Sequence, residues 1–371
     1  MSGFNHIVRG EKYMKDLKFA IIGAGAGGQS MAAILTQEGY RVRLYDIDSA
    51  KIERLNELDV IRITGAIEAE AKPEVITTDI AVVMDGADVI MVVTTTDGHA
   101  DVAEKISPYL RDGQIILLNP GHVGGALEVS AIIRESGCKA DLIIGEAGDL
   151  MYACRVMEVG HIFHSGIKKR TAVATLPAKD VNRLLEVLQP IFPMLVAADN
   201  VLYTGLVSGG AMLHPIPTLM NVNKIDLNQP FDYYMEGITP SVAKLIEVAD
   251  EERLAVCKAL RVEIPSLVKN LQRIYGLTQD DLYELLQNNE PYRGLKPPRD
   301  LSHRFVVEDI MSGLVPIASL GDQLGVPTPM IDAFIEIGSV AAGRDFRVEG
   351  RTVEKLGLAG KTVEEIHDYI S

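Results

Sequence analysis

A short run of glycines near the start of the chain restricts its fold more than any other feature. The run GAGAGG at residues 23–28 directly follows the apolar, β-prone segment 18–22. A segment with apolar residues at helical spacing comes next and ends at Gly39, which is typical of a helix C-terminus. A second β-prone segment, 42–45, then ends in Asp46. Strand, glycine turn, helix, strand and acid in this order predict a Rossmann-type βαβ unit, which binds dinucleotides.

The glycines of this turn have separate physical tasks. Gly23 permits the tight turn out of the strand, and Gly25 lets the backbone approach a pyrophosphate. Gly28 lets the helix pack closely on the strand, and the free N–H groups at the helix start would face the anion. We therefore expect a dinucleotide to contact the following residues: Gly23, Ala24, Gly25, Ala26, Gly28, Asp46 and Thr95.

The acid at the end of the second strand bears on the choice of cofactor. The carboxylate of Asp46 can accept hydrogen bonds from ribose hydroxyls, whereas a 2′-phosphate there would meet like charge. Asp48 adds to the repulsion, and only Lys51 and Arg54 oppose it. The sequence therefore predicts NAD as the cofactor, with NADP less favoured.

The pattern of apolar residues divides the chain into two parts. Further β-prone runs at 89–93, 115–118 and 142–144 alternate with amphipathic segments, which predicts a doubly wound parallel sheet. Past about residue 200 the strand patterns give way to long helical ones. We expect an α/β fold in which a Rossmann domain over 15–199 is followed by an all-helical substrate and catalytic domain over 200–371.

Charge and composition exclude several classes of function. The chain has 36 Lys and Arg against 51 Asp and Glu, a net charge of −15, so binding to nucleic acid or an anionic membrane surface is not expected. No apolar run is long enough to span a membrane, and Ser2 to Lys12 lack the apolar core of a secretory signal. The three cysteines, which are far apart and odd in number, predict neither a metal site nor a disulfide framework. We expect a cytoplasmic enzyme or small-molecule binder.

Two segments of the helical part carry residues suited to chemistry. His214 precedes Pro215, which should turn the chain away from helical angles and end the helix suggested over 205–213. A loop then leads from PYRG at 291–294 into SHRFVVED at 302–309, where arginines and acids crowd an apolar neighbourhood. These residues suit either a salt-bridged helix entry or a carboxylate-binding arginine beside an acid that orients a histidine.

At these residues the sequence resembles the opine dehydrogenases of the octopine/nopaline type. The resemblance runs from about residue 16 to about residue 345, and its C-terminal segments are more specific than the glycine turn. The matching segments are the glycine turn, 118–121 (LNPG), 214–215 (HP), 231–254, 291–294, 304–309 and 313–335. The first 14 residues lie outside it, and we expect that extension to be frayed.

The resemblance implies an NAD(P)-dependent oxidoreductase that acts on the CH–NH group. Such an enzyme joins an amino acid to a 2-oxo acid such as pyruvate and reduces the resulting imine, or runs the reverse. The family's catalytic His–Asp pair maps to His214 and Asp309, its carboxylate-binding arginine to Arg304, and the PYRG tyrosine to Tyr292. Met311 stands where the family often has proline, which concerns the local helix entry only.

Two other functions stay open on the sequence alone. A 2-oxo or hydroxy-acid reductase of the ketopantoate reductase or glycerol-3-phosphate dehydrogenase type would share the scaffold but use a catalytic lysine, for which Lys244 and Lys269 are candidates. A nucleotide-sensing protein without turnover would have no need of an acid–base pair. The apolar helices of the second half also leave room for a homodimer interface.

Overall fold

The computed structural model describes residues 16–371, which form two compact units. The first is an α/β unit that runs to Gly121, continues over Gly125–Val201 and includes Ile370–Ser371. The second is helical and contains His122–Gly124 and Leu202–Tyr369. Nothing in the sequence pattern predicts that residues 122–124 belong with the helices. The expectations for the first 14 residues, including the absence of a signal, fall outside the described residues.

An eight-stranded sheet forms the centre of the α/β unit. In spatial order its strands are β12 (Leu195–Ala197), β11 (Thr171–Leu176), β8 (Ile143–Ala147), β7 (Ile115–Leu118), β6 (Val89–Val92), β1 (Lys18–Ile22), β2 (Arg41–Tyr45) and β5 (Val75–Thr77). Neighbouring strands are parallel except β11, which runs antiparallel to β8. The predicted Rossmann-type sheet is confirmed, but the expectation of a purely parallel sheet is corrected at one edge, where β11 and β12, parallel to each other, run opposite to the other six strands.

The central strands are apolar throughout because helices cover both faces of the sheet. All residues of β6 and β7 are buried, as expected for parallel strands between two helical layers. The helices of this unit are α2 (Ala26–Gln37), α3 (Ser49–Glu57), α4 (Ile80–Met84), α5 (His99–Ile106), α6 (Gly125–Glu135) and α7 (Val181–Leu188), with short 3₁₀ turns η1 (Thr96–Gly98), η2 (Ser107–Tyr109) and η3 (Ala178–Asp180). The strand order reverses between β1 and β6, and such sheets bind ligands at the carboxyl ends of the strands at this point.

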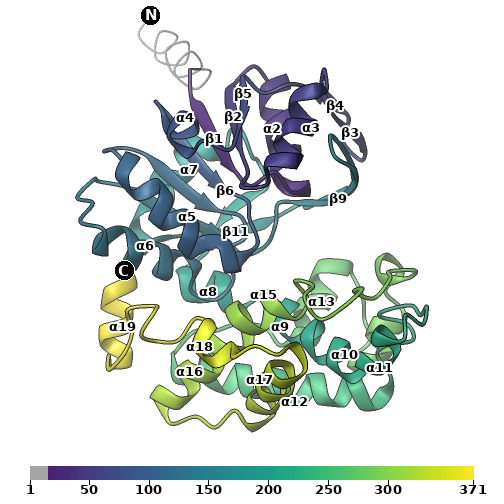
Figure 1. Ribbon diagram of the computed structural model, residues 1–371. Helices are drawn as coiled ribbons and strands as arrows, with labels where there is room; N and C mark the ends of the chain where they lie inside the picture. The colour runs from purple at the N-terminus through teal and green to yellow at the C-terminus, as the bar shows by residue number, and fades with distance from the viewer. Residues whose placement is uncertain (1–15) are drawn as a thin grey trace, which may run out of the picture. The chain divides into compact units, whose positions relative to one another are not determined.

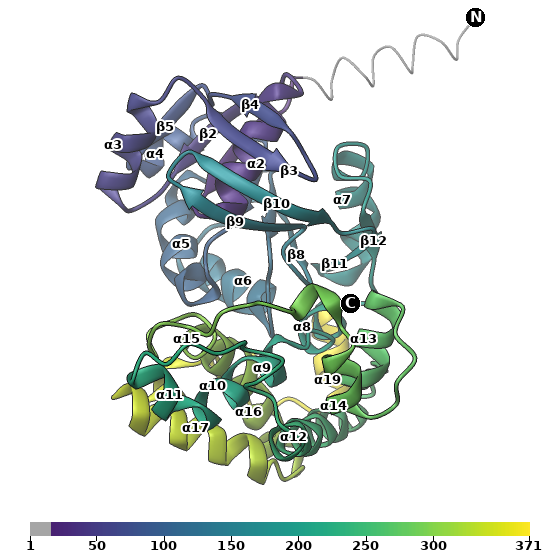
Figure 2. The ribbon, with the colours of Figure 1, turned by 90° about the vertical axis from the view of Figure 1, so that its right-hand side faces the viewer.

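A second sheet of four strands was not predicted. Its order is β4 (Ala69–Ala71), β3 (Ile61–Gly65), β10 (His161–Ile167) and β9 (Tyr152–Glu158), and α2 contacts strands of both sheets. Figure 2 shows β3, β9 and β10 crossing beside α2. The Ser30 hydroxyl on α2 lies 2.7 Å from Nε2 of the buried His164 on β10. These strands were missed because they are short or partly exposed and lack a long apolar run.

The second unit consists of helices and connecting loops. They are α8 (Val201–Leu206), α9 (Gly210–Leu213), α10 (Pro215–Met220), α11 (Val222–Asp226), α12 (Pro240–Ala259), α13 (Leu267–Tyr275), α14 (Leu282–Gln287), η4 (Glu290–Tyr292), α15 (Val307–Asp309), the π-turn η5 (Ile310–Leu314), α16 (Val315–Leu324), α17 (Pro329–Ala342), α18 (Phe346–Glu349) and α19 (Val363–Ile370). Figure 1 shows α12, α16 and α17 alongside one another, and each of them contacts the other two. The strands in the described part of the chain all precede residue 198.

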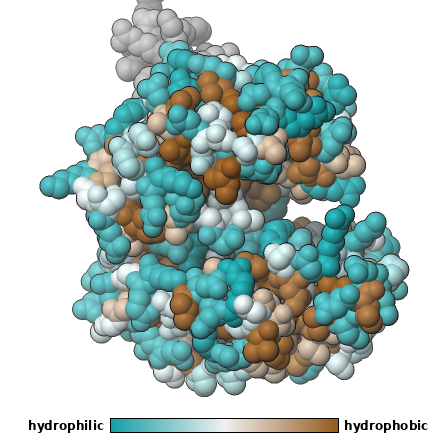
Figure 3. All heavy atoms as spheres, in the orientation of Figure 1, coloured by the Kyte–Doolittle hydropathy of each residue, from teal (hydrophilic) through white to brown (hydrophobic). Residues whose placement is uncertain are grey.

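One face of the described chain is largely hydrophilic (Figure 3). On the face shown in Figure 3, hydrophilic side chains cover most of each unit, and apolar ones are interspersed in small groups. Among the described residues, no helix is both long and apolar enough to cross a membrane.

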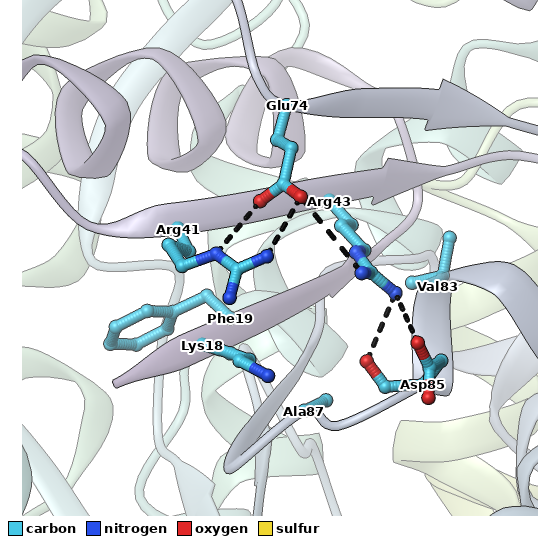
Figure 4. Close-up of a pocket in the computed structure, with 8 residues that line it drawn as sticks. All are labelled: Lys18, Phe19, Arg41, Arg43, Glu74, Val83, Asp85 and Ala87. Carbon is cyan, nitrogen blue, oxygen red and sulfur yellow. Dashed lines mark hydrogen bonds and ion pairs between the residues drawn. The ribbon is translucent and has the colours of Figure 1, made fainter. Parts of the chain in front are cut away.

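A small hollow lies at the amino ends of β1 and β2 (Figure 4). Both of its acids are paired with arginines, because Arg41 binds Glu74 through two nitrogens at 2.9 and 3.1 Å and Arg43 lies 3.4 Å from Asp85. It occupies the edge of the sheet opposite to the one at which Rossmann folds bind ligands. We therefore assign it a structural role.

Candidate active site

The glycine turn has the geometry that a bound dinucleotide requires. Gly23 has a φ of +105°, and a Cβ there would lie 2.7 Å from the main-chain oxygen of Val93. A Cβ on Gly28 would lie 1.7 Å from the Gly23 oxygen, so only glycine allows α2 to approach β1 so closely. Beside Gly25, in contrast, a Cβ would meet no atom within 4 Å, which leaves open space at the start of α2. Gly25 is the N-cap of α2 and makes no side-chain cap, so the first N–H groups of the helix are available to an anion.

Asp46 is held at the end of β2 by its neighbours. Its Oδ2 accepts a hydrogen bond from the Ala24 N–H at 2.7 Å, and its Oδ1 accepts one from the Asp48 N–H at 3.0 Å. The Lys51 ammonium lies 3.0 Å from Asp46 Oδ2 and 3.8 Å from Asp48. From the sequence, the positive charge of Lys51 was an argument for NADP. In the structure this charge is paired with Asp46, the acid that favours NAD.

The polar residues after the other strands have different environments. Thr95, the remaining predicted cofactor contact, is exposed and begins the turn η1 after β6. Asn119 and Glu146 are buried, and both hold main-chain N–H groups: Asn119 accepts from Met151 at 3.2 Å, and Glu146 accepts from Ala126 at 2.8 Å. We conclude that the glycine turn, Asp46 and the exposed Thr95 form the part of this edge suited to a cofactor.

In the helical unit, His214 lies at a break between two short helices. It follows α9 and directly precedes α10, whose first residue is Pro215. Its φ of −109° and ψ of −61° are in the right-handed helical region, so the expectation that His214 turns away from helical angles was wrong. The helix suggested over 205–213 is also interrupted, since α8 ends at Leu206 and α9 begins at Gly210. Proline is tolerated here because it occupies the first position of a new helix.

His214 and Asp309 form a hydrogen-bonded pair. The Nδ1 of His214 lies 2.8 Å from the Oδ2 of Asp309, although 95 residues separate them in the sequence. The histidine side chain is 18% exposed, and in the described part of the chain its Nε2 has no hydrogen-bond partner. A Cβ on Gly210 would lie 2.9 Å from Asp309 Oδ1, so the absence of a side chain at Gly210 gives the carboxylate room.

The environment of Asp309 keeps it ionised although it is completely buried. Burial alone raises the pKa of this carboxyl, but the charge and hydrogen bond of His214, with smaller effects of His122 and Arg304, outweigh it. The net result is a pKa below the ordinary aspartate value. A buried carboxylate on Nδ1 fixes the tautomer and the orientation of the histidine ring.

Arg304 and Glu308 lie one helical turn apart beside this pair. Nη1 of Arg304 is 3.4 Å from Oε2 of the buried Glu308, while the Arg304 side chain is 51% exposed. His122 reaches the same carboxylate, with its Nε2 3.9 Å from Glu308 Oε1. The guanidinium of Arg304 is therefore anchored on one side and open to a ligand on the other.

Tyr292 occupies a different position from the other predicted residues. Its ring stacks on Tyr234 at 4.1 Å between centroids and contacts Tyr275 edge-on at 5.4 Å. The main chain of its loop is tied to the segment that precedes α12, because the Gly294 N–H donates to Asp232 Oδ2 at 2.5 Å. The structure thus places Tyr292 in an aromatic cluster that continues through Tyr234 and Tyr233 to Phe305, whose ring contacts His214 and Arg304.

Several residues of the site were not found from the sequence. Phe305 stacks on the His214 ring, and the buried Tyr233 donates a hydrogen bond to the His214 main-chain oxygen at 2.6 Å. Phe305 belongs to the segment SHRFVVED, but the sequence alone indicates no role for it. Nothing in the sequence pairs His122 with Glu308. His122 does carry one structural signal: its φ of +54° is uncommon for a residue other than glycine.

The lysines of the rival reductase mechanism are not placed for catalysis. Lys244 and Lys269 are exposed and form ion pairs with Glu247 at 3.3 Å and Asp280 at 3.0 Å. Exposed pairs of this kind are common on helix surfaces. Among the described residues, no group of three or more His, Cys, Asp or Glu side chains could hold a metal ion.

Comparison with known proteins gives a consistent result. Residues 197–342 match the family model for the alpha-helical domain of NAD/NADP octopine/nopaline dehydrogenase, and residues 18–135 match that for the N-terminus of NAD-dependent glycerol-3-phosphate dehydrogenase. An opine dehydrogenase of Arthrobacter sp. (strain 1C) is 40% identical over 353 residues, which cover 95% of this chain and 98% of the relative.

Solved structures show the same architecture. Octopine dehydrogenase with NADH and L-arginine has a TM-score of 0.78 at 20% identity, over 94% of this chain and 97% of the other. Yersinopine dehydrogenase with bound NADP⁺ has a TM-score of 0.74 at 16% identity, over 96% and 98%.

The fold and the two groups of residues define an NAD(P)-dependent dehydrogenase with a Rossmann domain and a helical domain. More narrowly, the chain belongs to the opine dehydrogenase family. It is an oxidoreductase of the CH–NH group that joins an amino acid to a 2-oxo acid by reduction with a nicotinamide cofactor.

Proposed function

We propose that this chain condenses an amino acid with pyruvate or a related 2-oxo acid, with His214 as the acid–base group. The observation that carries the proposal is the 2.8 Å bond between His214 Nδ1 and the buried Asp309 carboxylate, which leaves Nε2 to act on a substrate. The choice of substrates is supported by octopine dehydrogenase, which has been solved with NADH and either L-arginine or pyruvate.

The residues suit each proton transfer of this reaction. The amine nitrogen attacks the carbonyl carbon of the oxo acid while His214 Nε2 takes a proton from the nitrogen. The imidazolium gives this proton to the carbonyl oxygen, which completes a neutral carbinolamine. A second proton, taken up from solvent by His214, then converts the carbinol hydroxyl into water, which leaves and gives the protonated imine. When bound, the reduced nicotinamide supplies the hydride for the imine carbon. Asp309 stabilises the imidazolium that exists between the two proton transfers.

Arg304 is the residue we propose for the oxo-acid carboxylate. A guanidinium presents a planar fork that matches a carboxylate through two parallel hydrogen bonds. Because the protein carries a net charge of −15, a local cation is needed to attract an anionic substrate. For Tyr292 we propose a contact with the substrate at the edge of the aromatic cluster.

For the cofactor we propose contacts with Gly23, Ala24, Gly25, Ala26, Gly28, Asp46 and Thr95. NAD is favoured because Asp46 lies where the adenosine ribose would bind and already holds Lys51. A 2′-phosphate would have to displace this ion pair or bind beside it.

The test is an NADH-oxidation assay with three mixtures: the oxo acid alone, an amino acid alone, and both together, over a panel of amino acids. We expect turnover only with both. A rate with the oxo acid that is the same without any amine would show the simple reductase instead. His214→Ala should lose most of kcat and keep NADH binding, which fluorescence titration measures; retained turnover would refute the role of His214.

Two further properties expected from the sequence stay proposals. The acidic composition, with a net charge of −15, supports a cytoplasmic location. The exposed apolar residues Ile337 and Val340 on α17 support a homodimer contact.

A further inference from the structure

One aromatic ring joins the two halves of the substrate-handling site. The ring of Phe305 lies parallel to the His214 imidazole, with 4.0 Å between centroids and 9° between planes. The guanidinium carbon of Arg304 lies 5.4 Å from the centroid of the same ring. The base and the carboxylate-binding cation therefore share one neighbour.

The helical spacing of this segment explains the arrangement. Residues four positions apart are neighbours on a helix surface. Phe305 and Asp309 therefore form one row of side chains, and Arg304 and Glu308 form the row beside it on the same helical turn. Main-chain hydrogen bonds from Glu308 and Asp309 to the Arg304 oxygen, at 3.1 and 3.3 Å, maintain the turn. In one row Phe305 supports the face of the His214 ring and Asp309 binds its edge. In the other row Glu308 anchors Arg304.

Other aromatic groups hold Phe305 itself in place. Tyr233, which is fully buried, contacts its ring at 5.3 Å, and His303 contacts it edge-on at 4.7 Å. Tyr233 also donates a hydrogen bond to the His214 main chain, so the same tyrosine fixes both stacked partners. A ring restrained on several sides can determine the plane of a neighbouring imidazole.

We propose that Phe305 is a positioning residue that orients the His214 imidazole, stabilises its protonated form and supports the Arg304 guanidinium. The face of a benzene ring attracts a cation more strongly than a neutral group, so the stack favours the imidazolium. This inference rests on the proposed roles of His214 and Arg304.

The test compares Phe305→Leu and Phe305→Tyr with the unaltered enzyme, using the best amino acid and oxo acid from the screen. Loss of the aromatic face should move the His214-dependent limb of the pH profile of kcat/KM to lower pH by roughly half a unit. This direction holds whether the neutral or the protonated histidine is the active form. We also expect kcat to fall and KM for the oxo acid to rise. The tyrosine variant, which keeps the ring face, should retain the pH profile of the unaltered enzyme.

Phe346→Leu is the matched control. Phe346 is buried in the same unit and has the Arg344 guanidinium 5.4 Å from its ring centroid, but the described structure records no histidine ring stacked on it. It should lower the thermal midpoint without moving the pH profile. If Phe305→Leu does no more than this control, or changes KM or kcat without the shift, Phe305 is a packing residue and the inference is wrong. If His214→Ala also retains turnover, the proposed function itself is wrong. If His214→Ala loses turnover but Phe305→Leu shows no pH shift, only the inference about Phe305 is wrong. Phe305→Met serves in place of the leucine variant if that variant does not fold.

Discussion

The substitution Asp309→Asn probes the catalytic pair with little change in shape. The charge of Asp309 is worth up to about 6 kcal/mol to an imidazolium 2.8 Å away, taking an effective dielectric constant of roughly 20. The cost of burying the carboxylate offsets part of this attraction, as its opposing effects on the pKa of Asp309 show. We therefore expect kcat to fall about 10²- to 10⁴-fold, which corresponds to roughly 3 to 5 kcal/mol in the barrier.

The physical reason includes the tautomer as well as the charge. An asparagine can turn its amide N–H toward Nδ1, which places the ring proton on Nε2 and removes the base. The assay is NADH oxidation under saturating substrates, with NADH affinity measured in parallel as a control for the first unit. A variant that keeps more than about a tenth of the original kcat would refute the account of the pair.

The same substitution gives a prediction about stability and pH. Because the pKa of Asp309 is lowered in the folded state, its contribution to the free energy of unfolding is present above the ordinary aspartate pKa. That contribution is lost as the pH falls through the lower, folded-state pKa. Denaturant titrations should therefore separate the two proteins near pH 7 and bring them together in strong acid. A difference that grows toward acid pH would contradict the stated direction.

Three other substitutions test separate parts of the structure. Arg304→Lys should raise KM for the oxo acid roughly 10- to 100-fold with a smaller effect on kcat, because one ammonium cannot replace a two-pronged fork; an unchanged KM would make Arg304 structural. Asp46→Asn should free Lys51 from its ion pair and raise the ratio of kcat/KM for NADPH to that for NADH by roughly tenfold, and an unchanged ratio would show that Asp46 does not select the cofactor. Asp250→Ala leaves the buried Arg253 without its carboxylate partner, 2.8 Å away in the unaltered protein, and should cost about 3–5 kcal/mol of unfolding free energy; a loss below about 1 kcal/mol would contradict the importance of this pair.

The geometry of the glycine turn could be predicted because its determinants are local. Gly23 and Gly28 are close in sequence, and a Cβ on Gly28 would meet the main-chain oxygen of Gly23, so the close approach of α2 to β1 is set within one turn. The helix caps follow the same rule where a pattern is complete: Thr362 and Glu365 bond reciprocally, at 2.8 and 3.2 Å, as expected from a capping box. Thr278 and Asp281 have the same spacing but form no such box, because Asp281 itself caps α14 by accepting a hydrogen bond from the Glu284 N–H.

The catalytic half depends on contacts between distant segments. His214 and Asp309 were paired through the family resemblance, and no spacing rule could have brought them together across 95 residues. The stacking of Phe305 on His214 and the recruitment of residues 122–124 into the helical unit are long-range consequences of packing. The smaller sheet also depends on a long-range contact, since β3 pairs with β10, which lies far away in the sequence.

The fate of the hydride is the most direct test of whether the enzyme reduces an imine formed from the amino acid and the 2-oxo acid. NADH labelled with deuterium at both C4 positions is incubated with the enzyme, pyruvate and the preferred amino acid, and the products are analysed by mass spectrometry. We expect one deuterium in a secondary amine dicarboxylate, on the carbon that was the pyruvate carbonyl. Deuterium found in lactate, at a rate that does not depend on the amine, would contradict it.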